Sequence, residues 1–122
     1  MIKVGINGFG RIGRLAFRIG LLKHGRELEF GAINTSGSMD TAGWAHLVNY
    51  DTTYRKFEIE IKSEEVKKPE LVNENDPLIG YFKSVGKGWK IPILAQRDPD
   101  KIPWKKYGVE VVIESTGKFI TE

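Results

Sequence analysis

The strongest chemical signal in the sequence is a run of three glycines near its start. Residues 8–13 are Gly-Phe-Gly-Arg-Ile-Gly, a GxGxxG pattern that follows an apolar strand and opens a helix. In such a loop Gly8 allows a tight turn, Gly10 lets an anion approach the main chain, and Gly13 lets the helix lie close to the sheet. The free N–H groups of residues 11–13 would point toward a pyrophosphate. The run predicts a dinucleotide-binding loop.

Two arginines beside this loop support a bound anion independently. Arg11 and Arg14 fall in the first turn of the helix, where the helix dipole is already positive and disfavours a cation by about 0.3–1 kcal/mol. An anion at the helix end would offset that cost. The alternative is that arginine is simply a good helix former whose side chains reach solvent. Taken with the glycines, the charges favour the anion.

The end of the second predicted strand bears on which dinucleotide would bind. A carboxylate there bonds the 2′-hydroxyl of the adenosine ribose and repels a 2′-phosphate. The sequence has Asn34 and Thr35 at this place, and residues 36–38 are Ser-Gly-Ser. Hydroxyls and glycine-rich main chain tolerate a 2′-phosphate. One interpretation is relaxed specificity, with NADP accepted beside NAD or preferred to it. The other is an ordinary polar turn, with the cofactor choice made elsewhere.

Alternating strands and helices would position this loop. The hydrophobic pattern predicts a strand over residues 2–7, a helix over 11–24 and a second strand over 29–34. A second helix, capped at residue 40 or 41, would end near residue 49. The apolar face of the first helix is predicted to consist of Ile12, Leu15, Ala16, Ile19 and Leu22.

The second half of the chain predicts more strands around an excursion. Residues 57–61 alternate apolar and charged side chains, as in a half-buried antiparallel strand, and residues 64–68 would form a charged turn. Residues 74–90 are rich in turn formers and predict an excursion. Residues 91–95 and 109–114 predict two further strands, the last buried on both faces. The whole pattern predicts an α/β fold: a Rossmann-type, mostly parallel sheet with helices on both faces, its first four parallel strands and an antiparallel excursion.

Composition excludes several kinds of site. The chain has 122 residues and no cysteine, so it offers no disulfide, thiolate metal ligand or thiol nucleophile. With only two histidines, no metal site is expected. The net charge of +3 is compatible with an anionic ligand but too small to indicate nucleic acid. No apolar run reaches the roughly 20 residues that cross a bilayer, and the N-terminus is unlike a signal peptide, so a cytoplasmic protein without a membrane partner is expected.

Six blocks of the sequence form a recognisable series. They are residues 4–14, 32–34, 45–47, 49–51, 96–99 and 114–119. The first is Val-Gly-Ile-Asn-Gly-Phe-Gly-Arg-Ile-Gly-Arg and the last is Glu-Ser-Thr-Gly-Lys-Phe, and the two together are highly specific. In their order along nearly the whole chain, the blocks resemble phosphorylating glyceraldehyde-3-phosphate dehydrogenase. The resemblance implies a Rossmann-type domain for NAD or NADP in an oligomeric oxidoreductase of glycolysis or related carbon metabolism.

The resemblance also implies which residues contact the cofactor. Around the pyrophosphate would lie Asn7, Gly8, Gly10, Arg11 and Ile12, with Phe9 in the same stretch. Asn34 and Thr35 would lie at the adenosine ribose, and Arg97 beside the adenine. The groove at the end of the fourth parallel strand would be lined by Ser115, Thr116, Gly117 and Phe119. This agrees with the rule that ligands lie at the carboxyl ends of parallel strands.

Three departures from the family pattern stand out. Thr35 replaces the usual aspartate, so the resemblance does not imply strict NAD specificity. Arg55 replaces the usual glycine, so the turn around it would be reshaped. Residues 57–97 form a longer stretch than usual, and residues 81–89 would be an added flap. Its lysines and aromatics could touch a partner, although a solvated loop is the favoured interpretation.

The family's catalytic cysteine and histidine, its phosphate-binding residues and its second domain have no counterpart in this sequence. In the family the cysteine attacks an aldehyde, the histidine acts as base, and hydride passes to the cofactor. We therefore expect residues 1–122 to be an incomplete NAD(P)-binding domain, inert alone and active when completed by the missing part of the dehydrogenase. The expected protein partners are that remainder or further copies of the chain in a homo-oligomer. The alternatives are an erythrose-4-phosphate dehydrogenase fragment, a non-catalytic nucleotide-binding or regulatory module, and a nucleic-acid binder, for which the basic and aromatic signal is weak.

Overall fold

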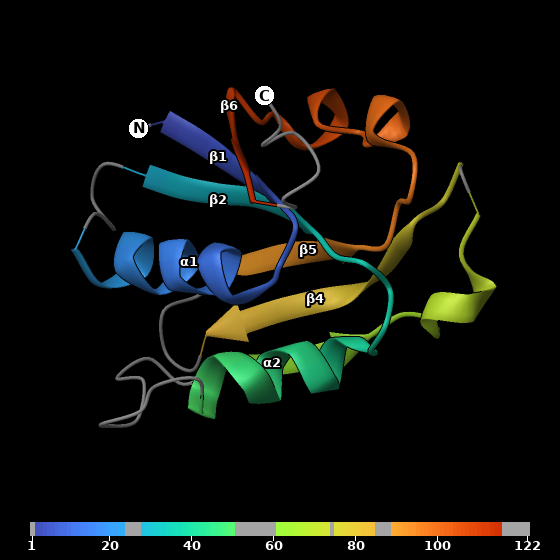
Figure 1. The fold of residues 1–122 in the computed structure, drawn as a ribbon, viewed down its shortest axis with the longest axis horizontal. Coiled ribbons are helices and arrows are strands. Elements are labelled where there is room, and N and C mark those ends of the chain that lie inside the picture. Colours follow the sequence, from blue (N-terminus) through green and yellow to red (C-terminus); the bar gives the residue numbers. More distant parts are fainter. Residues whose placement is uncertain (1, 24–27, 51–60, 74, 85–88, 116–122) are drawn as a thin grey trace.

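The computed structural model describes residues 2–23, 28–50, 61–73, 75–84 and 89–115 (Figure 1). The strands are β1 (Ile2–Asn7), β2 (Leu28–Asn34), β3 (Ile61–Glu65), β4 (Leu78–Ser84), β5 (Lys90–Leu94) and β6 (Val111–Glu114). The α-helices are α1 (Arg11–Lys23) and α2 (Thr41–Tyr50), and the short 3-10 helices are η1 (Pro69–Leu71), η2 (Pro99–Lys101) and η3 (Lys105–Tyr107).

The strands form one sheet in the order β3-β4-β5-β2-β1-β6. The four strands β5, β2, β1 and β6 are parallel to their neighbours in that group, whereas β4 runs antiparallel to β5 and β3 antiparallel to β4. The predicted fold class is confirmed: four parallel strands of a Rossmann-type sheet carry an antiparallel extension at one edge. The carboxyl ends of the four parallel strands therefore meet along one edge, where the glycine loop begins.

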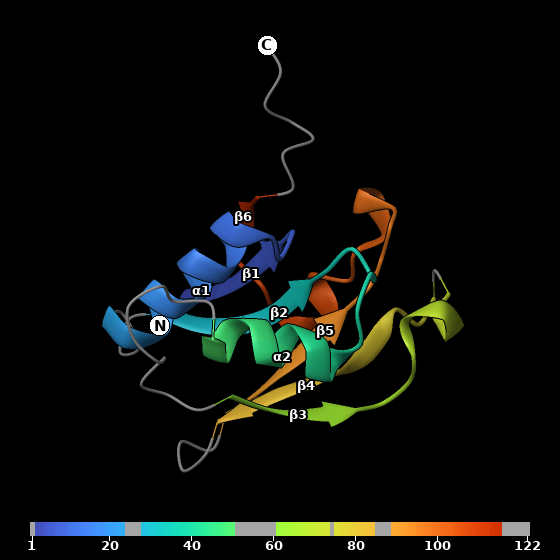
Figure 2. The ribbon, with the colours of Figure 1, turned by 60° about the horizontal axis from the view of Figure 1, so that its bottom comes forward.

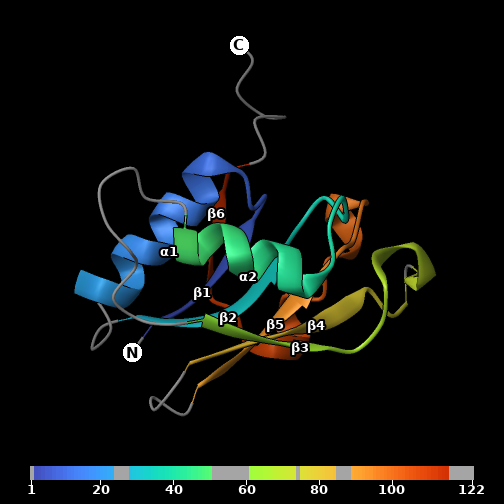
Figure 3. The same cartoon turned by 90° about the horizontal axis from the view of Figure 1, so that it is seen from below.

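Both α-helices of the described residues cover the same face of the sheet (Figures 2 and 3), whereas helices on both faces were predicted; the opposite face carries the 3-10 helix η3. An aromatic cluster fills the space beneath them: Phe17 of α1 lies with its ring centroid 5.0 Å from that of Phe30 and 5.8 Å from that of Phe9. On the opposite face, Tyr107 of η3 packs beside a smaller cluster that includes Leu94. Within the described residues, no helix is long and apolar enough to cross a membrane.

The predicted apolar face of α1 is wrong. Ile12, Leu15 and Ile19 are 67%, 48% and 41% exposed, so they point away from the sheet. The face that meets the sheet is narrow, with Phe17 fully buried and small residues beside it. At Gly20, an added Cβ would lie 2.6 Å from Cζ of Phe30. The helix thus packs closely through glycine, which leaves the branched side chains outside, and periodicity alone does not distinguish these two faces.

The predicted cap of α2 is confirmed at Asp40. Its Oδ1 accepts a hydrogen bond from the N–H of Gly43 at 2.8 Å, the bond expected of an N-cap. The carboxylate of Glu65, at the end of β3, accepts hydrogen bonds from the N–H groups of Thr41 at 3.3 Å and Ala42 at 2.7 Å. The negative charge of Glu65 on β3 therefore lies at the positive N-terminal end of α2 and satisfies two of its N–H groups.

Several predictions for the second half of the chain need correction. Glu64 and Glu65 belong to β3 and not to a turn, and β4 runs through the predicted excursion and flap. Gly80 lies in the middle of β4, where an added Cβ would be 2.3 Å from Oγ1 of Thr41. The missing side chain therefore allows α2 to pack on the sheet. Strand β6 is not buried on both faces, since Val111 is 50% exposed. The predictions for residues 57–60 and for Arg55 lie outside the described residues.

Candidate dinucleotide-binding site

The steric roles predicted for the three glycines are visible in the loop between β1 and α1. Gly8 has a φ of 96°, a left-handed conformation that glycine adopts without strain. An added Cβ on Gly13 would lie 2.2 Å from the carbonyl oxygen of Gly8 and 2.9 Å from Oγ of Ser115. On Gly10 the same atom would meet nothing within 4 Å. Gly8 and Gly13 therefore allow the loop to close, while open space lies next to Gly10.

The first turn of α1 presents main-chain donors at this open space. The N–H of Arg14 donates to the carbonyl oxygen of Gly10 at 2.9 Å, which makes Gly10 the N-cap. For the N–H groups of Arg11, Ile12 and Gly13, the residue four positions earlier lies outside the helix. The helix itself therefore leaves these groups unsatisfied. No acidic side chain lies in this first turn. The helix end can therefore accept an external anion.

The two arginines of this turn have different surroundings. Nη1 of Arg14 donates to the carbonyl oxygen of Phe9 at 3.2 Å, so this side chain braces the glycine loop. Arg11 is exposed at the surface. The phenyl ring of Phe9 is only 1% exposed and belongs to the core, so only its main chain faces the loop. Of these side chains, Arg11 is the one placed to meet an anion.

A buried amide network ties the carboxyl ends of β1, β2 and β5 together. Nδ2 of Asn34 donates to Oδ1 of Asn7 at 3.0 Å and to the carbonyl oxygen of Gln96 at 2.9 Å. Oδ1 of Asn34 accepts from the N–H of Gln96 at 2.9 Å. All three residues are at most 6% exposed. Asn34 thus fixes the sheet edge that carries the loop, instead of presenting its side chain to a ribose.

The same network reaches β6 on the other side. Nδ2 of Asn7 donates to both carboxylate oxygens of Glu114 at 3.0 Å. Oγ of Ser115 donates to the carbonyl oxygen of Gly8 at 2.6 Å. The N–H of Ser115 donates to the main-chain carbonyl oxygen of Asn7 at 2.9 Å. Side chains from the ends of β1, β2 and β6, together with the Gln96 main chain, therefore hold the floor of the site rigidly.

Thr35 is turned away from the surface. Its hydroxyl donates to the carbonyl oxygen of Leu94 at 2.8 Å and accepts from the N–H of Gly37 at 3.2 Å, and the residue is 3% exposed. The exposed hydroxyls in this turn are those of Ser36 and Ser38, which bond to each other at 3.0 Å. The serines, not Thr35, are the side chains that a ligand at the end of β2 would meet.

The structure brings most of the predicted residues together at one edge. Arg97 follows β5 on that edge and is exposed. Thr116, Gly117 and Phe119 lie outside the described residues. Within the described part of the chain, no group of three His, Cys, Asp or Glu side chains could hold a metal.

Two residues of the network, Gln96 and Glu114, were missed as site residues. Both follow or end parallel strands, and a polar residue at that position was the available signal.

Comparisons with known proteins agree with this geometry. The family described as "Glyceraldehyde 3-phosphate dehydrogenase, NAD binding domain" matches residues 2–122. The chain belongs to this family. Similar proteins are "Glyceraldehyde-3-phosphate dehydrogenase 1" of Bacillus cereus, 42% identical over 119 residues, and "Glyceraldehyde-3-phosphate dehydrogenase" of Thermotoga maritima, 40% identical over 119 residues. Each comparison covers 98% of this chain and 30% of the relative. The chain therefore spans about three-tenths of the length of these glyceraldehyde-3-phosphate dehydrogenases.

Membership confirms the resemblance and the class of cofactor. The matched family is an NAD-binding domain, and the relatives named above are dehydrogenases. The glycine loop predicted a dinucleotide ligand, and NAD, the ligand of the family, is a dinucleotide. Neither the erythrose-4-phosphate alternative nor the non-catalytic module is favoured by these names.

Proposed function

We propose that residues 1–122 act as the NAD(P)-binding domain of a glyceraldehyde-3-phosphate dehydrogenase. The observation that carries the proposal is the open space at Gly10 over the unsatisfied N–H groups of α1. The main chain of residues 8–12 would hold the pyrophosphate, and Arg11 would add a positive charge. Asn7, Asn34 and Ser115 would keep the loop in place. A bound dinucleotide would supply a hydride acceptor.

The catalytic thiol of such an enzyme would come from outside these residues, because the 122 residues contain no cysteine. Two features support a partner on the α1 side of the domain. Ile12, Leu15 and Ile19 form an exposed apolar stripe, and Val111 lies half exposed on the edge strand β6. We propose that the remainder of the dehydrogenase covers this side, in an oligomeric enzyme of glycolysis or related carbon metabolism. The isolated chain should then bind the cofactor without oxidising glyceraldehyde 3-phosphate. Its predicted cytoplasmic location is part of the same proposal.

For the cofactor we propose that NADP is accepted beside NAD. No carboxylate lies at residues 35–38, directly after β2, to repel a 2′-phosphate, and the exposed hydroxyls of Ser36 and Ser38 could donate to one. Predicted contacts of Thr116, Gly117 and Phe119 with the cofactor remain part of this proposal, as does the place of Arg97 beside the adenine.

Calorimetric titration of the 122-residue chain with NAD and with NADP tests both parts. We expect both dinucleotides to bind at millimolar concentration or below, and Gly10→Leu to weaken both by roughly tenfold or more because it fills the open space. If neither binds, the proposed function is lost. If NAD binds at least about a hundredfold more tightly than NADP, the domain keeps its function but relaxed specificity is wrong.

A further inference from the structure

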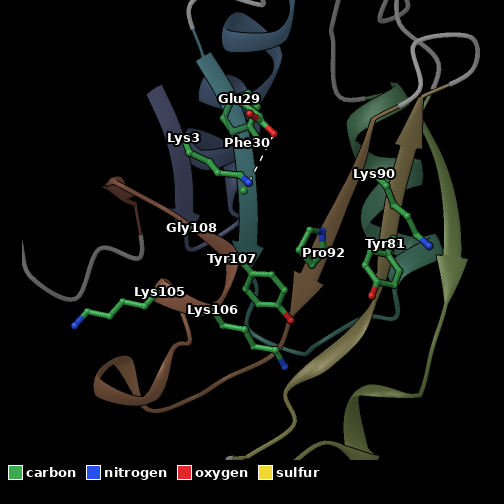
Figure 4. Close-up of a pocket in the computed structure, with 11 residues that line it drawn as sticks. Lys3, Glu29, Phe30, Tyr81, Lys90, Pro92, Lys105, Lys106, Tyr107 and Gly108 are labelled. Carbon is green, nitrogen blue, oxygen red and sulfur yellow. Dashed lines mark ion pairs between the residues drawn. The ribbon is translucent and has the colours of Figure 1, made fainter. Parts of the chain in front are cut away.

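A second hollow lies on the sheet face opposite α1 and α2 (Figure 4). It measures about 530 Å³ and is lined by strands β1, β2, β4 and β5 and by the η3 segment. Three of its residues lie near the amino ends of parallel strands: Lys3 in β1, Glu29 in β2 and Lys90 in β5. The glycine loop lies at the carboxyl ends of those strands, so the hollow is separate from the site proposed for the dinucleotide.

Cations outnumber anions around this hollow. Its charged lining consists of Lys3, Lys90, Lys105, Lys106 and one acid, Glu29. Nζ of Lys3 lies 3.8 Å from Oε2 of Glu29, so the acid balances one of the lysines. Among the described residues, no acid forms an ion pair with Lys105 or Lys106. The lining residues therefore carry a net positive charge, which favours an anionic ligand, while Asp76, paired with Lys67, brings one negative charge close to Lys106.

A nearby glutamate only partly offsets this charge. Oε2 of Glu64 lies 3.2 Å from Nζ of Lys90, while its Oε1 lies 3.1 Å from Nζ of Lys83. One carboxylate is thus shared between two ammonium groups. The ammonium of Lys90 is therefore held by Glu64, and Figure 4 shows it on the side of Tyr81 away from Pro92.

Two tyrosine–lysine pairs give the hollow a second chemical character. Tyr81 of β4 and Tyr107 of η3 lie on either side of Pro92 (Figure 4), which is the register partner of Tyr81 on β5. Nζ of Lys90 lies 4.2 Å from the ring centroid of Tyr81, and Nζ of Lys106 lies 5.7 Å from that of Tyr107. Both sides of the hollow therefore present a tyrosine ring, and the ammonium group of Lys106 lies near the Tyr107 side.

The hydroxyl of Tyr107 stays protonated in this setting. Burial, and next the neighbouring Tyr81 and Asp76, raise the pKa of Tyr107 above its ordinary value. The phenol is therefore a neutral donor that can bond an anionic oxygen without adding negative charge.

We propose that the hollow binds a nucleoside phosphate, with its planar base against Tyr81 and Tyr107 and its phosphate at Lys106. Tyrosine rings stack on any base, because every base has a π-face, and ammonium groups attract phosphate as point charges. The hollow also falls within the size range of small-molecule sites. A simple anion would use the lysines but leave the rings without a role. This site does not depend on the dinucleotide site for its existence.

Titration of the 15N-labelled 122-residue chain with AMP, followed by NMR, tests the proposal. The host is the Gly10→Leu variant, which separates this site from the glycine loop. We expect AMP to shift the amide signals of Tyr81, Tyr107 and Gly108. Lys106→Glu should weaken AMP binding by roughly tenfold, whereas Lys68→Glu, the same charge change at an exposed lysine outside the hollow, should leave it within about twofold. Ribose 5-phosphate, which lacks the base, and adenosine, which lacks the phosphate, should each bind more weakly than AMP by roughly tenfold.

Three results would overturn the proposal. In the first, AMP shifts only the signals of the glycine loop in the unaltered chain and binds nowhere in the Gly10→Leu host. In the second, ribose 5-phosphate binds as tightly as AMP, which removes the base from the site. In the third, a short oligothymidylate binds at the hollow and AMP does not. If NAD fails to bind at the glycine loop, the proposed function is lost but this proposal is not, because the AMP-induced shifts of the Tyr107 and Gly108 signals do not depend on that loop.

Discussion

Asn34 and Asn7 bond side chain to side chain across two parallel strands, Nδ2 of the first donating to Oδ1 of the second at 3.0 Å. Both residues are 4% exposed. Each amide uses its remaining donor or acceptor on a further strand end: Asn34 on Gln96, and Asn7 on Glu114. Buried polar groups stabilise a fold only when they are satisfied, so the pair makes the site geometry depend on one fully bonded network.

Replacing Asn34 with leucine should destabilise the chain by about 2–4 kcal/mol, because it leaves the N–H and carbonyl oxygen of Gln96 and the Oδ1 of Asn7 without their partner. Urea unfolding of the 122-residue chain measures this change. Ser36→Ala, at an exposed hydroxyl two residues away, should change stability by less than about 0.5 kcal/mol. Equal effects of the two substitutions would show that the network contributes nothing to stability.

Gly13 and Gly10 should respond oppositely to alanine. At Gly13 the new Cβ would lie 2.2 Å from a main-chain oxygen, so Gly13→Ala should destabilise the chain by about 1–3 kcal/mol. At Gly10 the Cβ meets nothing within 4 Å, so Gly10→Ala should cost less than about 1 kcal/mol, the loss of a glycine N-cap, and yet weaken dinucleotide binding. Urea unfolding and calorimetry measure the two effects. A Gly10→Ala chain that binds NAD unchanged would contradict the place given to the pyrophosphate.

The sequence predicted the elements better than their contacts. Strand β1, helix α1 and the glycine loop could be predicted because hydrophobic periodicity and glycine conformation depend on residues that are close together in the sequence. The orientation of Asn34 does not: its amide points to Asn7 and Gln96 because three strands meet there. No local pattern in the sequence encodes that meeting.

The errors in α1 and β4 have one physical cause. Gly20 and Gly80 each lie where a Cβ would collide, with Phe30 in one case and with Thr41 in the other. A glycine that permits close packing and a glycine that begins a turn are the same letter in a sequence. Only the neighbour in space distinguishes them, and that neighbour is distant along the chain.

Introducing an acid at Ser36 should restore discrimination between the two dinucleotides. The Ser36 side chain is exposed just beyond β2, so Ser36→Asp would place a carboxylate near the position proposed for the adenosine ribose. We expect NADP binding to weaken by roughly tenfold or more through repulsion of the 2′-phosphate, and NAD binding to change by less than about threefold. Ser36→Asn, equal in size and uncharged, is the control. Equal weakening of NADP by both variants would exclude charge as the cause.

Glu64 should make stability depend on pH in the acid range. Hydrogen bonds from Lys83 and then from Lys90 hold the pKa of its carboxyl below its ordinary value. A carboxyl whose pKa is lower in the folded than in the unfolded chain stabilises the fold above the unfolded pKa, and this stabilisation is lost as the pH falls and the group is protonated.

We therefore expect Glu64→Gln to lower the urea midpoint at pH 7, and the difference from the unaltered chain to shrink between about pH 5 and pH 3. Salt at about 1 M should shrink it as well, because the three groups are solvent-exposed and screened. Glu70→Gln, at an exposed glutamate outside this cluster, should shift the midpoint little at either pH. A difference for Glu64→Gln that stays constant from pH 7 to pH 3 would mean that the two lysines do not stabilise the charged carboxylate.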